Sequence, residues 1–330
     1  MGNNTTPKCS CVCCNAIGKY AFPARRRGGN NAYLCSWHME RLHNYTDENN
    51  QFVGKSKVNG FTWSRELETM KPSDYAKLEL MLQGYLPTSD CTCDIEFKSA
   101  IEYGLNIGSA YARTIEFLRN TGEIVLDENV GLHTHCGHAL INASTMPYIR
   151  RFYHSLFCDV MNEWLNDSDK YTQLFGRRAG CWAEPFTDRN RKACEHKNAI
   201  NVQHTPTIEF RSPRFQTAEQ YIAVMHYIKG FMTILIENYI PALEKAGLIM
   251  ISSDNNVHAI GNVSEKTESV DWDNYNLGIA ALTIEQRNIL KTAADKTSTK
   301  LVKHWKKFNV SDIHWTGEIG NAYQTRTETF

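Results

Sequence analysis

The chain has 330 residues, of which 42% are hydrophobic, and it carries 36 basic and 36 acidic side chains. A chain of this length is expected to hold about two domains. The hydrophobic content supports a buried core and excludes a disordered or a fibrous protein. The formal net charge of zero provides no overall attraction to nucleic acid or to an anionic membrane.

The cysteines and the most apolar stretch indicate the compartment. There are 11 cysteines, an odd number, and the first residues lack the basic and then apolar layout of a signal peptide. We therefore expect reduced cysteines, some of them metal ligands, in a cytoplasmic protein. The most apolar stretch runs from Tyr221 to Ile240, but it contains His226, Lys229 and Glu237. These side chains favour a buried amphipathic helix over a membrane span.

Residues 1–48 form the first predicted unit, because they are rich in cysteine, glycine, asparagine and arginine and poor in aliphatic side chains. Cys11 and Cys14 form one close pair, and Cys35 and His38 form another further along the chain. Two close pairs separated by a loop are the spacing of a tetrahedral structural zinc site. A small unit with so little aliphatic core also needs a cross-link. The alternative is a set of thiols without metal.

Two properties of the predicted zinc-binding module stay open, the ligands of its first pair and the role of its basic run. Cys9 and Cys13 are close to the first pair, although Cys11 and Cys14 fit the knuckle spacing best. A basic run at residues 25–27 is suited to contact with nucleic-acid phosphates, but such runs are more often simply solvated.

The rest of the chain divides into a polar linker at residues 44–51, a larger domain over residues 55–260 and a helical C-terminal extension over residues 261–330. Strands and helices follow one another without regular βαβ alternation, which indicates an α+β fold with an antiparallel sheet flanked by helices. Strands are expected at residues 62–68, 91–97, 131–135 and 206–211, and helices at residues 73–84, 109–119, 147–165, 217–246 and 282–308.

Four of the predicted strands carry charged side chains or histidines where a core strand would carry apolar ones, and three of them do so at positions i and i+2. Residues i and i+2 of a strand point to the same face. Burying several charges on one face is costly unless they bind ions or each other. Carboxylates, imidazoles and a guanidinium together suit divalent metals with a phosphate substrate. The candidate residues are Glu66 and Glu68, Glu96, His133 and His135, and Glu209 and Arg211.

The order of these motifs resembles that of the amidoligase family, which is similar to glutamine synthetase and the glutamate–cysteine ligases and is found often in phages and bacteria. Gly131-Leu-His-Thr-His135 matches the third motif of the family in full. Asn201 with Thr207-Ile-Glu-Phe-Arg211 matches the fourth. In the first motif Ser64 replaces the usual glycine, and in the second Asp90-Cys-Thr92 replaces an Asp-Gly-Ser turn.

The resemblance, over roughly residues 58–245, implies a glutamine synthetase-like fold and ATP-dependent amide bond formation through an acyl phosphate. ATP and Mg²⁺ or Mn²⁺ would be the cofactors, in the host cytoplasm if the chain is phage-encoded. A small-molecule or peptide carboxylate and an amine would be the substrates. The family has a further arginine, here Arg177 or Arg178. By resemblance, Glu66, Glu68, Glu96 and Glu209 would hold the metal, His133 and His135 metal or substrate, and Arg211 with Arg177 or Arg178 the phosphoryl group.

Two other interpretations belong to different classes. His133, His135 and His138 supply enough ligands for the zinc or iron site of a metal-dependent hydrolase. This interpretation leaves the carboxylate strands unexplained, and ADP release that depends on a carboxylate and an amine would exclude it. A non-catalytic phage structural or host-interaction protein would keep a ligase-like scaffold and dock through the zinc-binding module and the C-terminal helix. Such a protein would bind no nucleotide.

Overall fold

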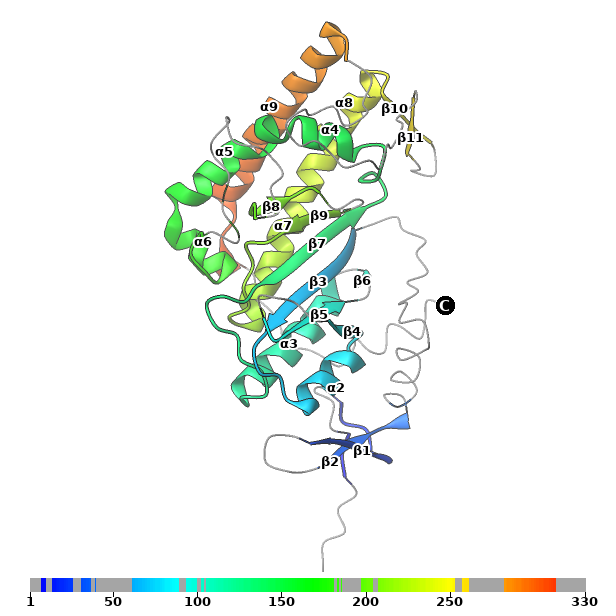
Figure 1. Cartoon of the computed structure of the whole chain (residues 1–330). Coiled ribbons are helices and arrows are strands. Elements are labelled where there is room, and N and C mark those ends of the chain that lie inside the picture. Colours follow the sequence, from blue (N-terminus) through cyan, green and yellow to red (C-terminus); the bar gives the residue numbers. More distant parts are fainter. Residues whose placement is uncertain are drawn as a thin grey trace, which may run out of the picture.

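The structure, a computed structural model, is built around one antiparallel sheet with helices packed on one of its faces and to one side (Figure 1). The small N-terminal hairpin lies at the opposite end of the molecule from α8 (Ile240–Lys245) and the start of α9 (Ile284–Lys307). The described residues are 7–9, 14–25, 31–36, 39, 61–88, 93–99, 102–103, 105–180, 183, 185, 197–203, 207–252, 257–260 and 282–312.

Seven strands of the described part of the chain form the sheet, in the order β4-β5-β3-β7-β9-β8, with β6 paired to β3. Every pair of neighbours is antiparallel. The predicted mixed α+β class with an antiparallel sheet is therefore confirmed. The strands are β3 (Phe61–Thr69), β4 (Tyr85–Thr88), β5 (Ile95–Ser99), β6 (Glu102–Tyr103), β7 (Leu132–His138), β8 (Ile200–Asn201) and β9 (Thr207–Phe210).

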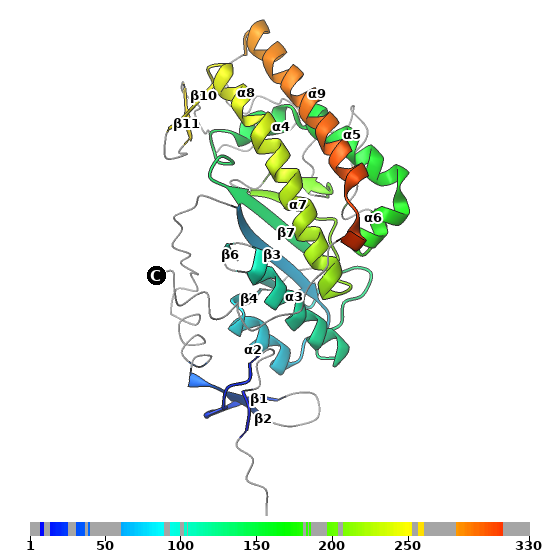
Figure 2. The same ribbon diagram turned by 180° about the vertical axis from the view of Figure 1, so that it is seen from behind.

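The two faces of the sheet differ in polarity. The register sets Leu67 opposite Phe97 on one side and Leu132 on the other, and all three side chains are fully buried. Helices α3 (Leu105–Asn120) and α7 (Ala218–Asn238) cover this apolar face, with α2 (Asp74–Leu82) beside α3 (Figure 2). The residues that alternate with the apolar ones therefore point to the other face, which carries the charges.

One charged side chain, Arg65, lies on the apolar face and is fully buried. Its Nε donates to the Tyr221 hydroxyl at 2.8 Å, and another guanidinium nitrogen donates to the Tyr85 hydroxyl at 3.2 Å. Its guanidinium also lies 5.3 Å from the ring centroid of Tyr111, within reach of a cation–π interaction. These contacts compensate the cost of burying the guanidinium and join β3 to the helices beneath it.

A second group of helices packs beside the sheet. Helix α9 packs against α5 and α7. The ring centroid of Trp305 lies 6.2 Å from that of Trp164 and 5.7 Å from that of Tyr227. The helical part of the predicted C-terminal extension therefore shares the core of the larger domain. The group comprises α4 (Met146–Arg151), α5 (Tyr153–Asn166), α6 (Ser168–Phe175), α8 (Ile240–Lys245) and α9 (Ile284–Lys307). The hairpin of β10 (Ile249–Ile251) and β11 (Val257–Ala259) lies between α8 and α9 in the chain, and the 3₁₀ helix η1 (Val310–Asp312) follows α9.

Two helices predicted as continuous are each divided. The prediction over residues 147–165 becomes α4 and α5, separated at Phe152. The prediction over residues 217–246 becomes α7 and α8, separated at Tyr239, because Pro241 lacks the N–H that a continuing helix needs. No helix within the described ranges combines the length and the apolarity that a membrane crossing requires.

The N-terminal module contains a two-stranded hairpin, β1 (Tyr20–Arg25) and β2 (Asn31–Leu34), which contacts α2. Of the basic run, residues 26 and 27 lie outside the described residues, as does the predicted linker at residues 44–51. The hairpin brings the segment before β1 and the residue after β2 to the same place, because Lys19 donates its backbone N–H to the Leu34 carbonyl at 2.8 Å.

Candidate metal centre

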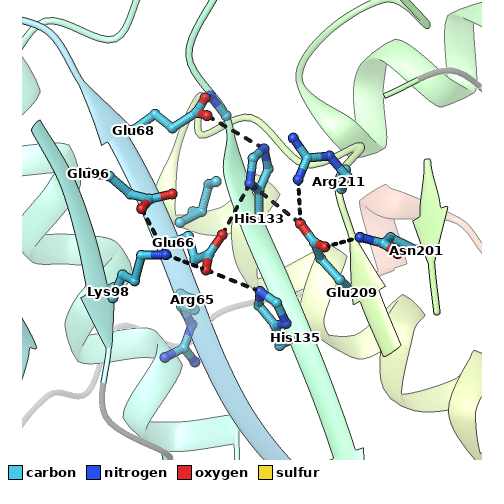
Figure 3. Close-up of polar contacts among 12 residues, drawn as sticks. Arg65, Glu66, Glu68, Glu96, Lys98, His133, His135, Asn201, Glu209 and Arg211 are labelled. Atoms are coloured by element: carbon cyan, nitrogen blue, oxygen red, sulfur yellow. Dashed lines mark hydrogen bonds and ion pairs between the residues drawn. The ribbon is translucent and has the colours of Figure 1, made fainter. Parts of the chain in front are cut away.

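The charged face of the sheet gathers the side chains that the sequence predicted as a site (Figure 3). The register sets Glu66 opposite His133, and His135 opposite Glu209, so strand alternation places all four on the same face. Four strands that are dispersed along the sequence thus contribute to one cluster, which we call the charged-face cluster. It contains Glu66, Glu68, Glu96, His133, His135, Glu209 and Arg211.

His133 lies at the centre of this cluster and is only 3% exposed. Its Nδ1 is 3.6 Å from Glu66 Oε2 and also 3.6 Å from Glu209 Oε1, and its Nε2 is 3.9 Å from Glu68 Oε1. These separations are longer than hydrogen bonds. Among the described residues, Nδ1 is a buried atom without a hydrogen-bond partner. Two ligands of one small cation lie roughly 3.0–3.4 Å apart, so these atoms would share an ion after approaching one another by roughly 0.5 Å.

Glu66 belongs to two possible ligand groups. One consists of Glu66, His135 and Glu209, and the other of Glu66, Glu96 and His133, with the ligand atoms of each group within 4.8 Å of one another. The Thr207 hydroxyl lies 3.2 Å from His135 Nδ1 and orients the ring, while Nε2 of the same ring is 3.7 Å from Glu66 Oε1. The arrangement can therefore hold two cations that share one carboxylate.

The surroundings of Glu66 and Glu209 favour their ionised forms. Burial raises the pKa of Glu66, but His133, His135 and Lys98 more than offset burial and hold its pKa well below the usual range. Burial also raises the pKa of Glu209, and the charges of His133 and Arg211 again bring it below the ordinary value. Both carboxylates are therefore ionised at neutral pH, as metal ligands must be.

Two positively charged side chains, Lys98 and Arg211, neutralise part of the negative charge of these carboxylates. Lys98 Nζ lies 3.1 Å from Glu66 Oε1 and 3.0 Å from Glu96 Oε2, between the two carboxylates. Arg211 lies 2.7 Å from Glu209 Oε1. The sequence prediction missed Lys98, although it follows Glu96 at position i+2 and so shares the spacing that identified the other residues.

Asn201 also belongs to the site, since its side-chain amide donates to Glu209 Oε2 at 2.7 Å. The prediction named Asn201 only as part of a motif and gave it no role. Its position on β8, directly opposite Glu209 on β9, follows from strand pairing that the sequence does not reveal.

Gly131 supports the cluster from the start of β7. Its backbone N–H donates to Glu68 Oε2 at 2.6 Å. A Cβ atom at this position would lie 2.8 Å from His133 Nε2, closer than real Cβ atoms approach. The first residue of the Gly-Leu-His-Thr-His motif must therefore be glycine if the His133 ring is to keep its place.

The structure distinguishes the two arginines between which the sequence could not decide. Arg177 donates from Nε to the Ser212 carbonyl at 3.1 Å and from another nitrogen to the Arg211 carbonyl. Burial lowers the pKa of Arg177, whereas the nearby charge of Glu68 raises it. Arg178 is exposed. Arg177 therefore borders the charged-face cluster and fixes the backbone that carries Arg211.

The predicted three-histidine site is not formed. His138 lies one strand position out of phase with His133 and His135, and it pairs with Phe61, whose ring centroid is 5.2 Å away. Alternation therefore directs His138 to the opposite face from the other two histidines. Cys136 shares that opposite face, and burial raises the pKa of its thiol, so it is a core residue rather than a nucleophile.

A second ligand cluster lies in the N-terminal module. Cys9, Cys14 and Cys35 each place the sulfur within 4.8 Å of the other two. Burial, and after it the neighbouring sulfurs, raise the pKa of Cys14 to about 12, against a backbone hydrogen bond from Ala16. The predicted ligands Cys11 and His38 lie outside the described residues, as does Asp90 of the second motif.

Comparisons with known proteins identify no family for this chain. No protein-family model matches the chain, and no curated protein matches its sequence. The amidoligase resemblance therefore stays a prediction that rests on four ordered motifs.

Proposed function

We propose that the chain is an ATP-dependent carboxylate–amine ligase that holds two divalent cations, Mg²⁺ or Mn²⁺, on the charged face of its sheet. The observation that carries the proposal is the spacing around His133 and Glu66. Imidazole and carboxylate atoms lie 3.6–3.9 Å apart, too far for hydrogen bonds and suited to shared ions. Arg211 of the same cluster would supply the guanidinium that recognises phosphoryl oxygens.

The proposed reaction has two steps. The γ-phosphoryl group of ATP passes to the oxygen of a substrate carboxylate, which gives an acyl phosphate and ADP. An amine then attacks the acyl carbon, so that the amide bond forms as inorganic phosphate leaves. This chemistry depends on positioning and on neutralised phosphate charge rather than on a protein nucleophile. Bound divalent cations would supply that neutralisation.

Different residues of the cluster would bind the cations and contact the phosphoryl group. Glu66 and Glu209, both ionised, would hold cations together with the two imidazoles. Arg211 would contact the transferring group, and Arg177 would position Arg211 through its hydrogen bonds to the backbone. A mixture of carboxylate and imidazole ligands suits Mn²⁺ as well as Mg²⁺, which makes paramagnetic Mn²⁺ the probe of choice.

The test measures Mn²⁺ binding by electron paramagnetic resonance and Mg²⁺-dependent ATP binding by calorimetry. The wild type is compared with the double variant Glu66→Ala, Glu68→Ala, and with Glu237→Ala as a control on the exposed surface of α7. We expect the wild type and the control to bind both ligands. The double variant should bind Mn²⁺ at least about 100-fold more weakly and lose ATP binding, because it lacks Glu66, which both ligand groups share, and Glu68, which lies next to His133.

The outcomes separate the classes of protein. If the wild type binds Mn²⁺ but not ATP, the cluster is a metal site of another kind and the ligase proposal fails. If the wild type binds neither, a non-catalytic protein on a ligase-like scaffold is the better interpretation. ADP release that requires both a carboxylate and an amine would establish the reaction class.

A further inference from the structure

The three cysteine sulfurs of the N-terminal module have the spacing of metal ligands rather than of a disulfide. Cys14 Sγ lies 4.0 Å from Cys35 Sγ, and neither these two nor Cys9 is in a disulfide. A disulfide joins sulfurs at about 2.05 Å. Sulfurs at two corners of a tetrahedral zinc site, each about 2.3 Å from the ion, lie roughly 3.8 Å apart. The observed distance is close to this second value.

The backbone of the module is arranged to bring these sulfurs together. Cys9 donates its N–H to the Ala16 carbonyl at 2.8 Å, and Gly18 donates to the Pro7 carbonyl at 2.8 Å, so the segments on either side of Cys14 meet. The hairpin then returns Cys35, directly after β2, to the same place.

Two further observations point to a ligand at this cluster. The Cys35 backbone N–H donates to Cys9 Sγ at 3.4 Å, a contact that stabilises negative charge on that sulfur. Cys9 and Cys35 are buried, in a module with few aliphatic side chains. Three clustered thiols contribute little as a hydrophobic core, but as thiolates they bind a soft cation tightly enough to fold a small module.

We propose that Cys9, Cys14 and Cys35 are ligands of one tetrahedral zinc ion, with Cys9 in the place that the knuckle spacing gave to Cys11. The ion closes the module by tying the segment before β1 to the end of β2. The fourth position is taken by a ligand that the described residues do not supply. The proposal is independent of the ligase function, because no residue of the charged-face cluster takes part.

The test compares two serine variants of the full chain that differ only in which cysteine is changed, Cys9→Ser and Cys11→Ser. Zinc content is measured by mass spectrometry of the metal, and Co²⁺ is substituted to record the absorption of a tetrahedral thiolate site. We expect one zinc per chain in the wild type and in Cys11→Ser. In Cys9→Ser, zinc affinity should fall at least about tenfold and the thiolate-to-cobalt absorption should decrease.

A second measurement needs no variant and so does not depend on the folding of one. The wild type is alkylated with iodoacetamide with and without bound zinc, and the modified cysteines are identified by peptide mass spectrometry. Protection of Cys9, Cys14 and Cys35 by zinc, with Cys11 still modified, supports the proposal. Protection of Cys11 in place of Cys9 overturns it, as does a chain without zinc or a Cys14–Cys35 disulfide.

Discussion

The charged-face cluster and the three thiols of the module are both groups of possible metal ligands, but different structures carry them. The carboxylates and imidazoles come from the strands of a seven-stranded sheet whose opposite face is packed with apolar side chains. The thiols come from the segment before a two-stranded hairpin and from the residue directly after it. A two-stranded hairpin is at best marginally stable alone, whereas a sheet packed on helices folds without help from an ion.

The contacts within each cluster show the same contrast. In the sheet, Glu209 already pairs with Arg211 and Asn201, and Lys98 already lies between two carboxylates. In the module, the Cys14 and Cys35 sulfurs face each other at 4.0 Å, and the Cys9 sulfur lies within 4.8 Å of both. We therefore expect the sheet cluster to be organised before any metal binds and its proposed ions to serve chemistry. We expect the ion proposed for the module to hold the module's shape.

The largest expected effect tests whether the sheet cluster is organised by its own ion pairs. Glu209→Ala removes a carboxylate that is 1% exposed and leaves the Arg211 guanidinium without the oxygen now 2.7 Å away. Because breaking a buried ion pair leaves a charge uncompensated, we expect the free energy of unfolding to fall by about 3–5 kcal/mol. Urea denaturation in the absence of metal measures it, with Glu237→Ala as the exposed control.

A loss below about 1 kcal/mol in Glu209→Ala would mean that the pair contributes no more than a surface salt bridge. The charged-face cluster would then resemble that of the module, because its side chains would take up their arrangement only when an ion binds.

The next effect concerns the position of His133. Gly131→Ala would place a Cβ atom 2.8 Å from Nε2 of this ring, which must move away from its carboxylate neighbours. Overpacking of this kind costs about 1–3 kcal/mol, and we expect Mn²⁺ to bind about tenfold more weakly. The matched control is Gly180→Ala, where the nearest atom to the new Cβ is 4.0 Å away. Equal Mn²⁺ affinity in Gly131→Ala and wild type would show that His133 is not a ligand.

A smaller effect, of opposite sign, comes from Lys98. Its ammonium lies between Glu66 and Glu96, where a cation of the second ligand group would bind, so a metal ion must displace it. Lys98→Met should therefore tighten Mn²⁺ binding by about two- to fivefold, a modest change because the side chain is 48% exposed. Lys77→Met, which removes an ordinary surface pair with Asp74, is the control. Weaker Mn²⁺ binding in Lys98→Met would show that the lysine instead orients the ligands.

The predictable part of the charged-face cluster was the part that depends on local geometry. Alternation along a strand is fixed by the backbone, so the spacing of Glu66 and Glu68 and of His133 and His135 was enough to place each pair on one face. The same rule, applied fully, would have included Lys98 and excluded His138. Both residues were therefore predictable from the sequence alone.

Other features depend on contacts between distant segments, which no local pattern encodes. The sequence does not tell which strands are neighbours, so the pairing of Asn201 with Glu209 was not predictable. Arg177 and Arg178 are adjacent, and only the path of the chain decides that the first reaches the carbonyl of Arg211. Spacing likewise favoured Cys11, which lies outside the described residues, and it did not show that folding brings Cys9 to Cys14 and Cys35.

The smallest expected effect tests whether the two clusters are independent. The module reaches the larger domain through the contact of β1 with α2, and α2 contributes no side chain to the charged-face cluster. Removal of zinc with a thiol-reactive mercurial should therefore change the Mn²⁺ affinity of the sheet by less than about twofold, because sites that share no partners behave additively. Mn²⁺ titration before and after zinc release measures this, with re-addition of zinc after a reducing agent as the control. A larger change would mean that α2 transmits the state of the module to β3, the strand directly before it, and the two clusters would then have to be treated as one coupled system.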